Sequence, residues 1–177
     1  MGLLKQKICL LGTFAVGKTS LVERFVHERF DEKYLTTVGI SVSQKLMPPI
    51  QSRHNGRTVQ YMFLIWDIAG LEKFDPMVIN YFRGASGALA VADLTRPETI
   101  GRLEPICKKF MSVNPHAALV TIGNKLDLFK DDDATHSGLK KLASAYSSEV
   151  MLTSAKSGHG IEAAFNLLSH RIDASNE

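Results

Sequence analysis

The segment from Gly12 to Ser20, with the sequence GTFAVGKTS, constrains the fold of this chain more than any other. It follows an apolar run at residues 8–11 and precedes residues 21–26, which have the apolar spacing of an amphipathic helix. A strand, a tight loop and a helix in this order are the context in which G-x-x-x-x-G-K-[ST] forms a phosphate-binding loop. Gly12 and Gly17 allow the backbone angles and close approach that such a loop needs.

The side chains of this loop suggest individual roles. Lys18 is expected to reach the β- and γ-phosphates of a nucleotide, and the Thr19 hydroxyl to bind Mg²⁺. Successive N–H groups and the start of the helix point toward negative charge, so the loop backbone is expected to bind phosphate as well. The other residues assigned to nucleotide binding here are Phe14, Ala15, Val16, Gly17 and Ser20. The alternative interpretation is a glycine-containing turn between a strand and a helix.

The length and composition favour one compact domain over residues 1–177. With 177 residues and 45% hydrophobic content, the chain can bury a core without disulfides or metals. The net charge of +3 is mild and the basic residues are dispersed, so nucleic acid is not an expected partner. Cys9 and Cys107 lie in apolar patterns and are interpreted as buried free thiols, which favours a reducing, cytoplasmic location.

The ends of the chain predict no direct membrane attachment. No segment has the length of a transmembrane helix, and no leader pattern precedes the first strand. Gln6 stands where a myristoylation signal has Ser or Thr, and residues 173–177 contain no cysteine for a prenyl anchor. Membrane contact is therefore expected to be indirect at most.

A second motif, Asp67-Ile68-Ala69-Gly70, directly follows an apolar strand pattern that begins at Val59. An acidic residue at the carboxyl end of a buried strand can hold Mg²⁺, and a following glycine can offer its N–H to a γ-phosphate. Asp67 and Gly70 are assigned these roles. The alternative is an aspartate that ends the strand and caps a helix.

A third motif, Asn124-Lys125-Leu126-Asp127, follows the apolar run at residues 118–123. Asp127 is expected to accept hydrogen bonds from N1–H and the 2-amino group of guanine. Adenine offers an acceptor at N1 and has no 2-amino group, so it would leave this carboxylate unpaired. Lys125 is expected to lie along the base and Asn124 to tie this loop to the phosphate loop. Taken alone, the motif could be a solvated turn.

The last strand pattern, residues 150–153, leads into Ser154-Ala155-Lys156. The Ala155 N–H is expected to face the guanine O6, with Ser154 and Lys156 shaping the loop around it.

Strand and helix patterns alternate along the chain, which predicts an α/β fold with a mainly parallel sheet flanked by helices. Ligand loops then lie at the carboxyl ends of the strands. Residues 47–57 form a long connection with an Asn-Gly turn signal, which predicts a protruding loop. The expected strands are 8–11, 40–46, 59–66, 88–93, 118–123 and 150–153, and the expected helices are 18–27, 97–112, 137–147 and 161–171.

In this order, the motifs resemble those of the Ras-superfamily small GTPases. The resemblance covers residues 7–172, and smaller echoes, including residues 34–39, 81–85 and 95–99, favour the Rab-like branch. It implies the three-layer fold of P-loop NTPases with a six-stranded sheet, and a GTP/GDP switch that uses Mg²⁺. The chain resembles a divergent, prokaryotic-type member of the superfamily.

The resemblance also implies two switch segments, at about 30–39 and 67–81. Thr37 matches the threonine that binds Mg²⁺ and the γ-phosphate, Phe30 the aromatic that packs on guanine, and Tyr34 the one that closes over the phosphates. The γ-phosphate would hold both segments, which would relax after hydrolysis. Effectors, exchange factors and activating proteins are expected to bind there.

The sequence departs from the family at the catalytic positions, which the resemblance places at Lys18, Thr37, Gly70 and Leu71. Leu71 stands where the family has the glutamine that orients the attacking water, and leucine has no donor or acceptor. Phe14 replaces a small or polar residue and is expected to crowd the γ-phosphate, and Ile68 replaces a common threonine. Hydrolysis is therefore expected to be slow.

Three interpretations remain at this point. The leading one is a GTP-binding switch with weak intrinsic hydrolysis. The second is a GTP-loaded interaction module without meaningful turnover, and Leu71 is either native or an engineered replacement that locks the GTP state. The third is a P-loop kinase that uses ATP, which the Asn124–Asp127 motif disfavours.

Overall fold

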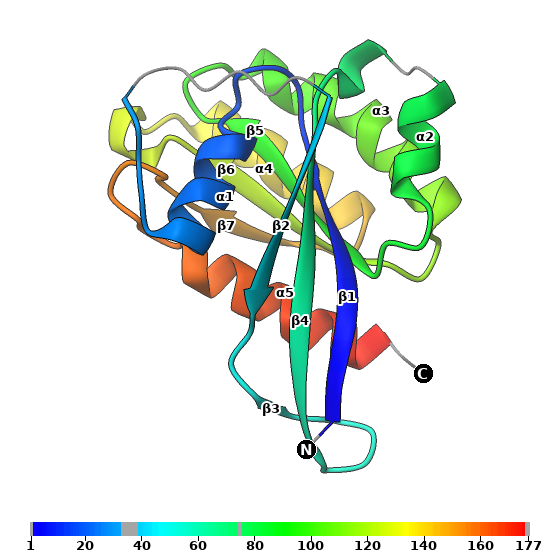
Figure 1. The fold of residues 1–177 in the computed structure, drawn as a ribbon. Helices are drawn as coiled ribbons and strands as arrows, with labels where there is room; N and C mark the ends of the chain where they lie inside the picture. The colour runs from blue at the N-terminus through cyan, green and yellow to red at the C-terminus, as the bar shows by residue number, and fades with distance from the viewer. Residues whose placement is uncertain (1, 33–38, 74–75, 176–177) are drawn as a thin grey trace.

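The computed structural model describes residues 2–32, 39–73 and 76–175, in which strands and helices alternate (Figure 1). The elements are β1 (Gly2–Leu11), α1 (Lys18–His27), β2 (Ile40–Leu46), β3 (Ile50–Gln51), β4 (Thr58–Ile68), the 3-10 helix η1 (Leu71–Lys73), α2 (Pro76–Phe82), β5 (Gly87–Asp93), α3 (Glu98–Val113), β6 (Ala118–Asn124), the 3-10 helix η2 (Leu126–Leu128), α4 (Asp133–Ala145), β7 (Glu149–Leu152) and α5 (Ile161–Ser175).

The main sheet has the strand order β2-β4-β1-β5-β6-β7. β1 is parallel to β4 and β5, and the β5–β6 and β6–β7 pairs are also parallel, whereas β2 is antiparallel to β4. The predicted mainly parallel, six-stranded sheet is therefore confirmed, with the two-residue strand β3 added beside β4. Because β1, β4, β5, β6 and β7 run in one direction, the loops after them gather at one edge of the sheet.

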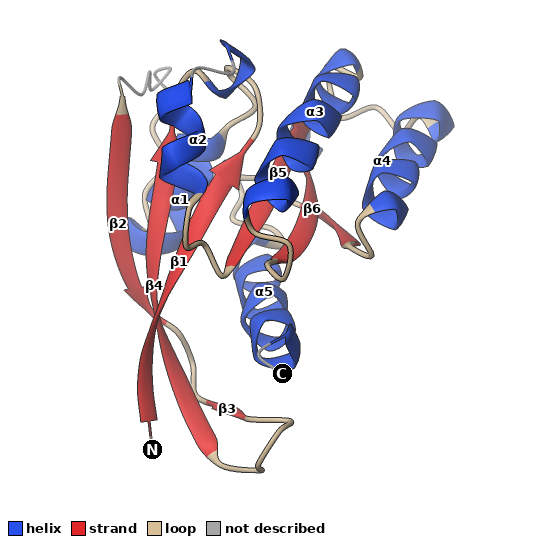
Figure 2. Cartoon of the chain, turned by 90° about the vertical axis from the view of Figure 1, so that its right-hand side faces the viewer, coloured by secondary structure: helices blue, strands red, loops and turns tan. Residues whose placement is uncertain are grey.

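Helices cover both faces of this sheet, which confirms the three-layer arrangement (Figure 2). Alternation along β1 divides the core: Ile8 belongs to a cluster with residues of α1 and α5, and Cys9 to a cluster with residues of α2, α3 and α4. Phe25 of α1 stacks on Phe165 of α5 with ring centroids 3.8 Å apart, which locks these two helices together.

Both cysteines are buried free thiols, as predicted. Burial raises the pKa of Cys9 and of Cys107 to about 12, so neither is a reactive thiolate at neutral pH. No helix among the described residues is long and apolar enough to cross a bilayer.

Three element boundaries differ from the predictions by four residues or more. β1 begins at Gly2 because residues 2–7 pair with β4, although polar side chains interrupt their apolar pattern. α4 begins at Asp133, four residues earlier than predicted, because the Asp132 carboxylate accepts hydrogen bonds from the N–H groups of Ala134 and Thr135. The acidic run is thus the cap of this helix. α5 continues to Ser175.

The long connection at residues 47–57 is fastened to the end of α5. The Asp173 carboxylate accepts hydrogen bonds from the Arg53 N–H at 2.8 Å and from the Tyr61 hydroxyl at 3.2 Å. Burial opposes ionisation of Asp173, but these donors outweigh it and lower its pKa. The turn itself closes with Gly56 at φ 64°, as the Asn-Gly signal predicted.

Candidate nucleotide-binding site

The loop between β1 and α1 has the backbone of a phosphate cradle. Gly12 and Gly17 have φ angles of 150° and 99°. A Cβ on Gly12 would lie 2.5 Å from the carbonyl oxygen of Val91, and one on Gly17 would lie 2.4 Å from Nδ2 of Asn124. Both positions therefore require glycine, and the first residues of α1 present their N–H groups to the same space.

Lys18 is the cation of this cradle. Its ammonium group donates hydrogen bonds to the carbonyl oxygens of Gly12 at 2.8 Å and Thr13 at 3.1 Å. Burial lowers the pKa of Lys18, while the charges of Asp67 and Glu72 act in the opposite direction. A phosphate group here would supply the anion that a desolvated ammonium needs.

Thr19 and Asp67 come together from the start of α1 and the end of β4. The Thr19 hydroxyl, in the first turn of α1, donates a hydrogen bond to the Asp67 carboxylate at the end of β4. Mg²⁺ prefers oxygen ligands and is commonly bound by one or two protein groups together with substrate phosphates. No group of three or more His, Cys, Asp or Glu side chains with metal-site geometry occurs in the part of the chain that is described. The Thr19 hydroxyl and the Asp67 carboxylate are oxygen ligands that fit a magnesium ion bound jointly with a nucleotide.

Asn124 links the loop expected to bind the base, residues 124–127 and hereafter the base loop, to the phosphate loop, residues 12–20. Its side-chain amide donates to the Val16 carbonyl at 3.0 Å and accepts from the Thr153 hydroxyl at 3.0 Å. The side chain is only 1% exposed, so both bonds are protected from water. The tie expected from the sequence is present, and Thr153 orients it.

Asp127 is oriented by the loop that follows β7. The Ser154 hydroxyl donates a hydrogen bond to Asp127 at 2.6 Å and accepts one from the Ser157 N–H at 3.1 Å. Lys125 adopts a left-handed backbone with φ 66°, which turns the chain so that η2 carries Asp127 into the site.

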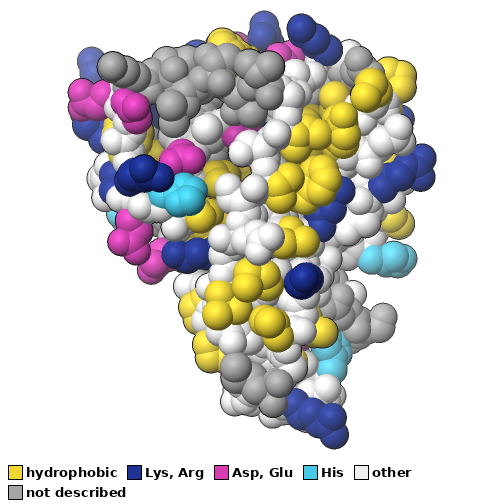
Figure 3. Space-filling model, in the orientation of Figure 1, with side chains coloured by type: hydrophobic (Ala, Val, Ile, Leu, Met, Phe, Trp, Pro, Cys, Tyr) yellow, Lys and Arg dark blue, Asp and Glu magenta, His cyan; other side chains and the backbone are white. Residues whose placement is uncertain are grey.

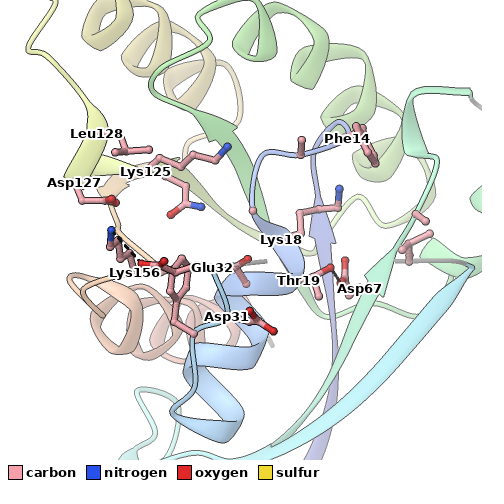
Figure 4. A pocket seen from close by; sticks show the side chains of 18 of the residues that line it. Phe14, Lys18, Thr19, Asp31, Glu32, Asp67, Lys125, Asp127, Leu128 and Lys156 are labelled. Atoms are coloured by element: carbon pink, nitrogen blue, oxygen red, sulfur yellow. Dashed lines mark hydrogen bonds and ion pairs between the residues drawn. The ribbon is translucent and has the colours of Figure 1, made fainter. Parts of the chain in front are cut away.

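These groups line a cavity of about 390 Å³. Figure 4 shows Lys125, Asp127 and Leu128 at one end of it, and Lys18, Thr19, Asp67 and Phe14 at the other. A nucleotide has the same two ends, a base and a charged phosphate chain. The lining residues are Phe14, Ala15, Gly17, Lys18, Thr19, Ser20, Phe30, Asp31, Glu32, Asp67, Ile68, Ala69, Gly70, Asn124, Lys125, Asp127, Leu128, Ala155 and Lys156.

Five of the predicted site residues are not among these. Val16 is buried and contributes its carbonyl to Asn124, and Ser154 acts through Asp127. Leu71 is 1% exposed and packs in the apolar cluster with Cys9, so the structure gives it a packing role. Tyr34 and Thr37 lie outside the described residues, and their roles remain predictions.

The lining also includes five residues that the sequence did not single out for binding: Asp31, Glu32, Ile68, Ala69 and Leu128. Glu32 lies 3.6 Å from the ammonium group of Lys156. Four of them directly adjoin a predicted site residue, and Glu32 lies two positions after Phe30, so closeness in the sequence was an available signal. Leu128 reaches the cavity only because η2 folds over it.

Three charged residues that support the site were missed as well. Asp93, fully buried at the end of β5, binds Lys125 at 2.7 Å and Arg96 at 2.9 Å. Arg24 of α1 donates to the carbonyl oxygens of Ala155, at 2.8 Å, and Lys156. The position of Asp93 at a strand end could have revealed it, whereas nothing in the pattern of α1 distinguished Arg24 from a surface residue.

Comparison with known proteins agrees with this geometry. The Ras family model matches residues 7–174. The chain belongs to the Ras family. Ras-related protein Rab-31 of Rattus norvegicus is 34% identical over 97% of this chain and 85% of its own length. Ras-related protein Rab-22A of Homo sapiens is 35% identical over 99% of this chain and 88% of its own length. RabC of Dictyostelium discoideum is 29% identical over 96% and 84%, respectively.

Family membership confirms the Rab-like, Ras-superfamily resemblance. The chain is a small GTPase with a P-loop and the α/β fold of that family. Membership also disfavours the third interpretation, a P-loop kinase that uses ATP.

Proposed function

We propose that this chain is a guanine-nucleotide-dependent switch that binds GTP and GDP with Mg²⁺ and hydrolyses GTP slowly. The observation that carries the proposal is the cavity in which Asp127 lies at one end and Lys18, Thr19 and Asp67 at the other. The loops that follow β1, β4, β6 and β7 all contribute to it.

Guanine specificity rests on Asp127. Ser154 occupies one oxygen of this carboxylate, which fixes its orientation before the base arrives. The guanine N1–H and 2-amino groups match a carboxylate acceptor, while adenine places a lone pair against it. Lys125 is fixed by Asp93 at 2.7 Å, which supports its role along the base.

Phosphate and metal binding rest on the start of α1. Lys18 supplies positive charge and the helix N-terminus supplies N–H groups to the β- and γ-phosphates. Thr19 and Asp67 would hold Mg²⁺, which when bound neutralises charge on the β- and γ-phosphate oxygens. Gly70 lies in the same cavity, where its N–H could bind the γ-phosphate.

Slow hydrolysis follows from two side chains. Leu71 has no group that can orient water, and its burial holds it away from the cavity. Phe14 lines the phosphate end and is 58% exposed, which leaves its ring where a partner's catalytic arginine would need to enter. The alternative, a GTP-loaded interaction module without turnover, is favoured by the same two residues.

We further propose that segments 30–39 and 67–81 are the switches through which effectors, exchange factors and activating proteins act. Between them, β2 and β4 present a partly exposed apolar face (Figure 3). Val42 is 49% exposed opposite Trp66, and Leu46 is 48% exposed opposite Met62. An apolar surface that joins both switches suits a protein partner in signalling or trafficking.

Two measurements test the proposed function. The nucleotide released by denaturing the purified protein is expected to be GTP or GDP, and released ATP would contradict the guanine assignment. Single-turnover hydrolysis of bound GTP is expected to be slow for the parent protein and faster for Leu71→Gln. No turnover by either over many hours, with or without cell extract, would favour the non-hydrolysing module.

Leu71→Gln places an amide in an apolar cluster, so its GDP affinity and melting temperature must be compared with those of the parent. Phe14→Ala is the companion variant, because the ring is largely exposed and its removal leaves the core intact. Faster hydrolysis with an added activating protein in Phe14→Ala, but not in the parent, would identify the ring as the obstacle.

A further inference from the structure

Asp93 is connected through two cations to loops at both ends of the cavity. It is the last residue of β5 and pairs in register with Asn124 of β6. Its side chain is fully buried, yet it is ionised in a network of four donors. Oδ2 binds Lys125 at 2.7 Å and Arg96 at 2.9 Å, while Oδ1 accepts from the Thr95 N–H at 2.9 Å and the Thr95 hydroxyl at 2.7 Å.

The two cations that contact Asp93, Lys125 and Arg96, connect it to different loops of the site. Lys125 belongs to the base loop and lines the cavity. Arg96, at the loop before α3, uses its second arm to donate to the carbonyl oxygen of Phe14 in the phosphate loop at 3.1 Å. Oδ2 of Asp93 therefore contacts Lys125 directly, and it is connected through Arg96 to the Phe14 carbonyl of the phosphate loop.

The hydrogen-bond network around Asp93 favours one fixed arrangement of Lys125, Thr95 and Arg96. Burial opposes ionisation of Asp93, but the hydrogen bonds from Lys125, Thr95 and Arg96 outweigh it and lower its pKa. A buried carboxylate with all its donors in place is costly to rearrange, because any lost donor leaves charge without compensation. Arg96 also holds the carbonyl group of Phe14 in place. The next residue, Ala15, has an unfavourable φ of 67°.

We propose that Asp93 and Arg96 are positioning residues that couple the base loop, residues 124–127, to the phosphate loop, residues 12–20. The two loops would then bind the nucleotide together and release it together. The inference rests on the proposed guanine-nucleotide binding. It assigns to Arg96 a role in the lifetime of the complex and none in recognition of the base, because Arg96 lies outside the cavity lining.

The test is dissociation of a fluorescent GDP analogue from the full chain in the presence of Mg²⁺. Arg96→Ala removes the contact with Phe14, and we expect dissociation to accelerate about tenfold. The preference for GDP over IDP, which lacks the 2-amino group, is expected to stay at the parent value because Asp127 is untouched. A variant that merely loosened the fold would change the melting temperature without this selective effect on dissociation.

Coupling is measured by a double-mutant cycle. Arg96→Ala and Lys125→Ala share Asp93, so the dissociation rate of the double variant should differ severalfold from the product of the two single effects. Asp93→Asn should reproduce the double variant. If Asp93→Asn does not fold, the cycle on Arg96 and Lys125 still decides the matter.

The matched control is Arg102→Ala, an exposed arginine on α3. It should leave dissociation unchanged. Unchanged dissociation in Arg96→Ala, or a strictly multiplicative cycle, would overturn the coupling while leaving the proposed function intact. A parent protein that binds no guanine nucleotide would overturn both, so the two failures are distinguishable.

Discussion

The two ends of the cavity are built from the same kinds of loops, yet they differ in how closely they follow the family. At the base end, Ser154 orients Asp127, and Arg24 donates a hydrogen bond to the carbonyl oxygen of Ala155 at 2.8 Å. At the phosphate end, Lys18 and Thr19 are in place, but Phe14 contributes an aromatic ring, and Leu71, the residue after Gly70, packs in the core.

The difference separates binding from turnover. Binding depends on the Asp127 carboxylate at the base end and on the Lys18 charge and backbone N–H groups at the phosphate end, and these groups are in place. Turnover depends in addition on a side chain that orients water and on space for a partner's arginine. We therefore propose that this chain combines nucleotide binding with an altered catalytic end, so that the timing of the switch depends on its partners.

The largest expected effect tests the base end. Asp127→Ala removes the acceptor for both guanine donors, and we expect GDP affinity to fall by about a thousandfold, or roughly 4 kcal/mol. Displacement titration with a fluorescent analogue measures it. Unchanged GDP affinity would show that Asp127 does not recognise guanine and that the base end does not follow the family pattern.

Gly17→Ala tests the connection between the ends. The new Cβ would lie 2.4 Å from Asn124 Nδ2, whose bonds to Val16 and Thr153 resist movement. Alanine at position 17 would also have to adopt the φ of 99° that Gly17 has, which is unfavourable for a residue with a side chain. We therefore expect a loss of about 3 kcal/mol in the free energy of unfolding. Chemical denaturation measures this loss, and Gly101→Ala, in a position where a Cβ meets open space on α3, is the matched control.

Lys18→Met tests the phosphate end. Loss of the charge is expected to reduce affinity for GDP and GTP by about a hundredfold, because charge-assisted hydrogen bonds contribute roughly 1.5–3 kcal/mol each. Affinity for guanosine, which has no phosphate, should not change. Isothermal titration compares the three ligands, and equal losses for guanosine and GDP would mean that Lys18 supports the fold instead.

The smallest expected effect refines the base end. Ser154→Ala removes the hydroxyl that orients Asp127 at 2.6 Å, and we expect about a tenfold loss of GDP affinity. Ser144→Ala, at an exposed position of α4, should have no effect. If Ser154→Ala binds GDP as the parent does, Asp127 is held by other contacts and its orientation is less dependent on this loop.

Much of the fold and the site was predictable because it is local. The glycines and the lysine of residues 12–18 need one specific loop, and alternating strand and helix patterns fix the fold class. Boundaries were less predictable: β1 gained residues 2–7 because β4 offers them hydrogen-bond partners, which no local pattern reveals. The contribution of Leu128 to the cavity likewise depends on how η2 folds.

The amino-acid sequence predicts which chemical groups are available: a phosphate-binding loop, two oxygen groups suited to Mg²⁺, a carboxylate suited to guanine and a leucine at position 71, which cannot orient water. Those properties follow from residue type and order, so they are readable without coordinates. The packing of Leu71 in the core, and the contacts that join Asp93 to Lys125 and, through Arg96, to the phosphate loop, became visible only in the folded chain. Such contacts join residues distant in the chain, and their energies depend on burial, which exists only after the sheet and helices have assembled.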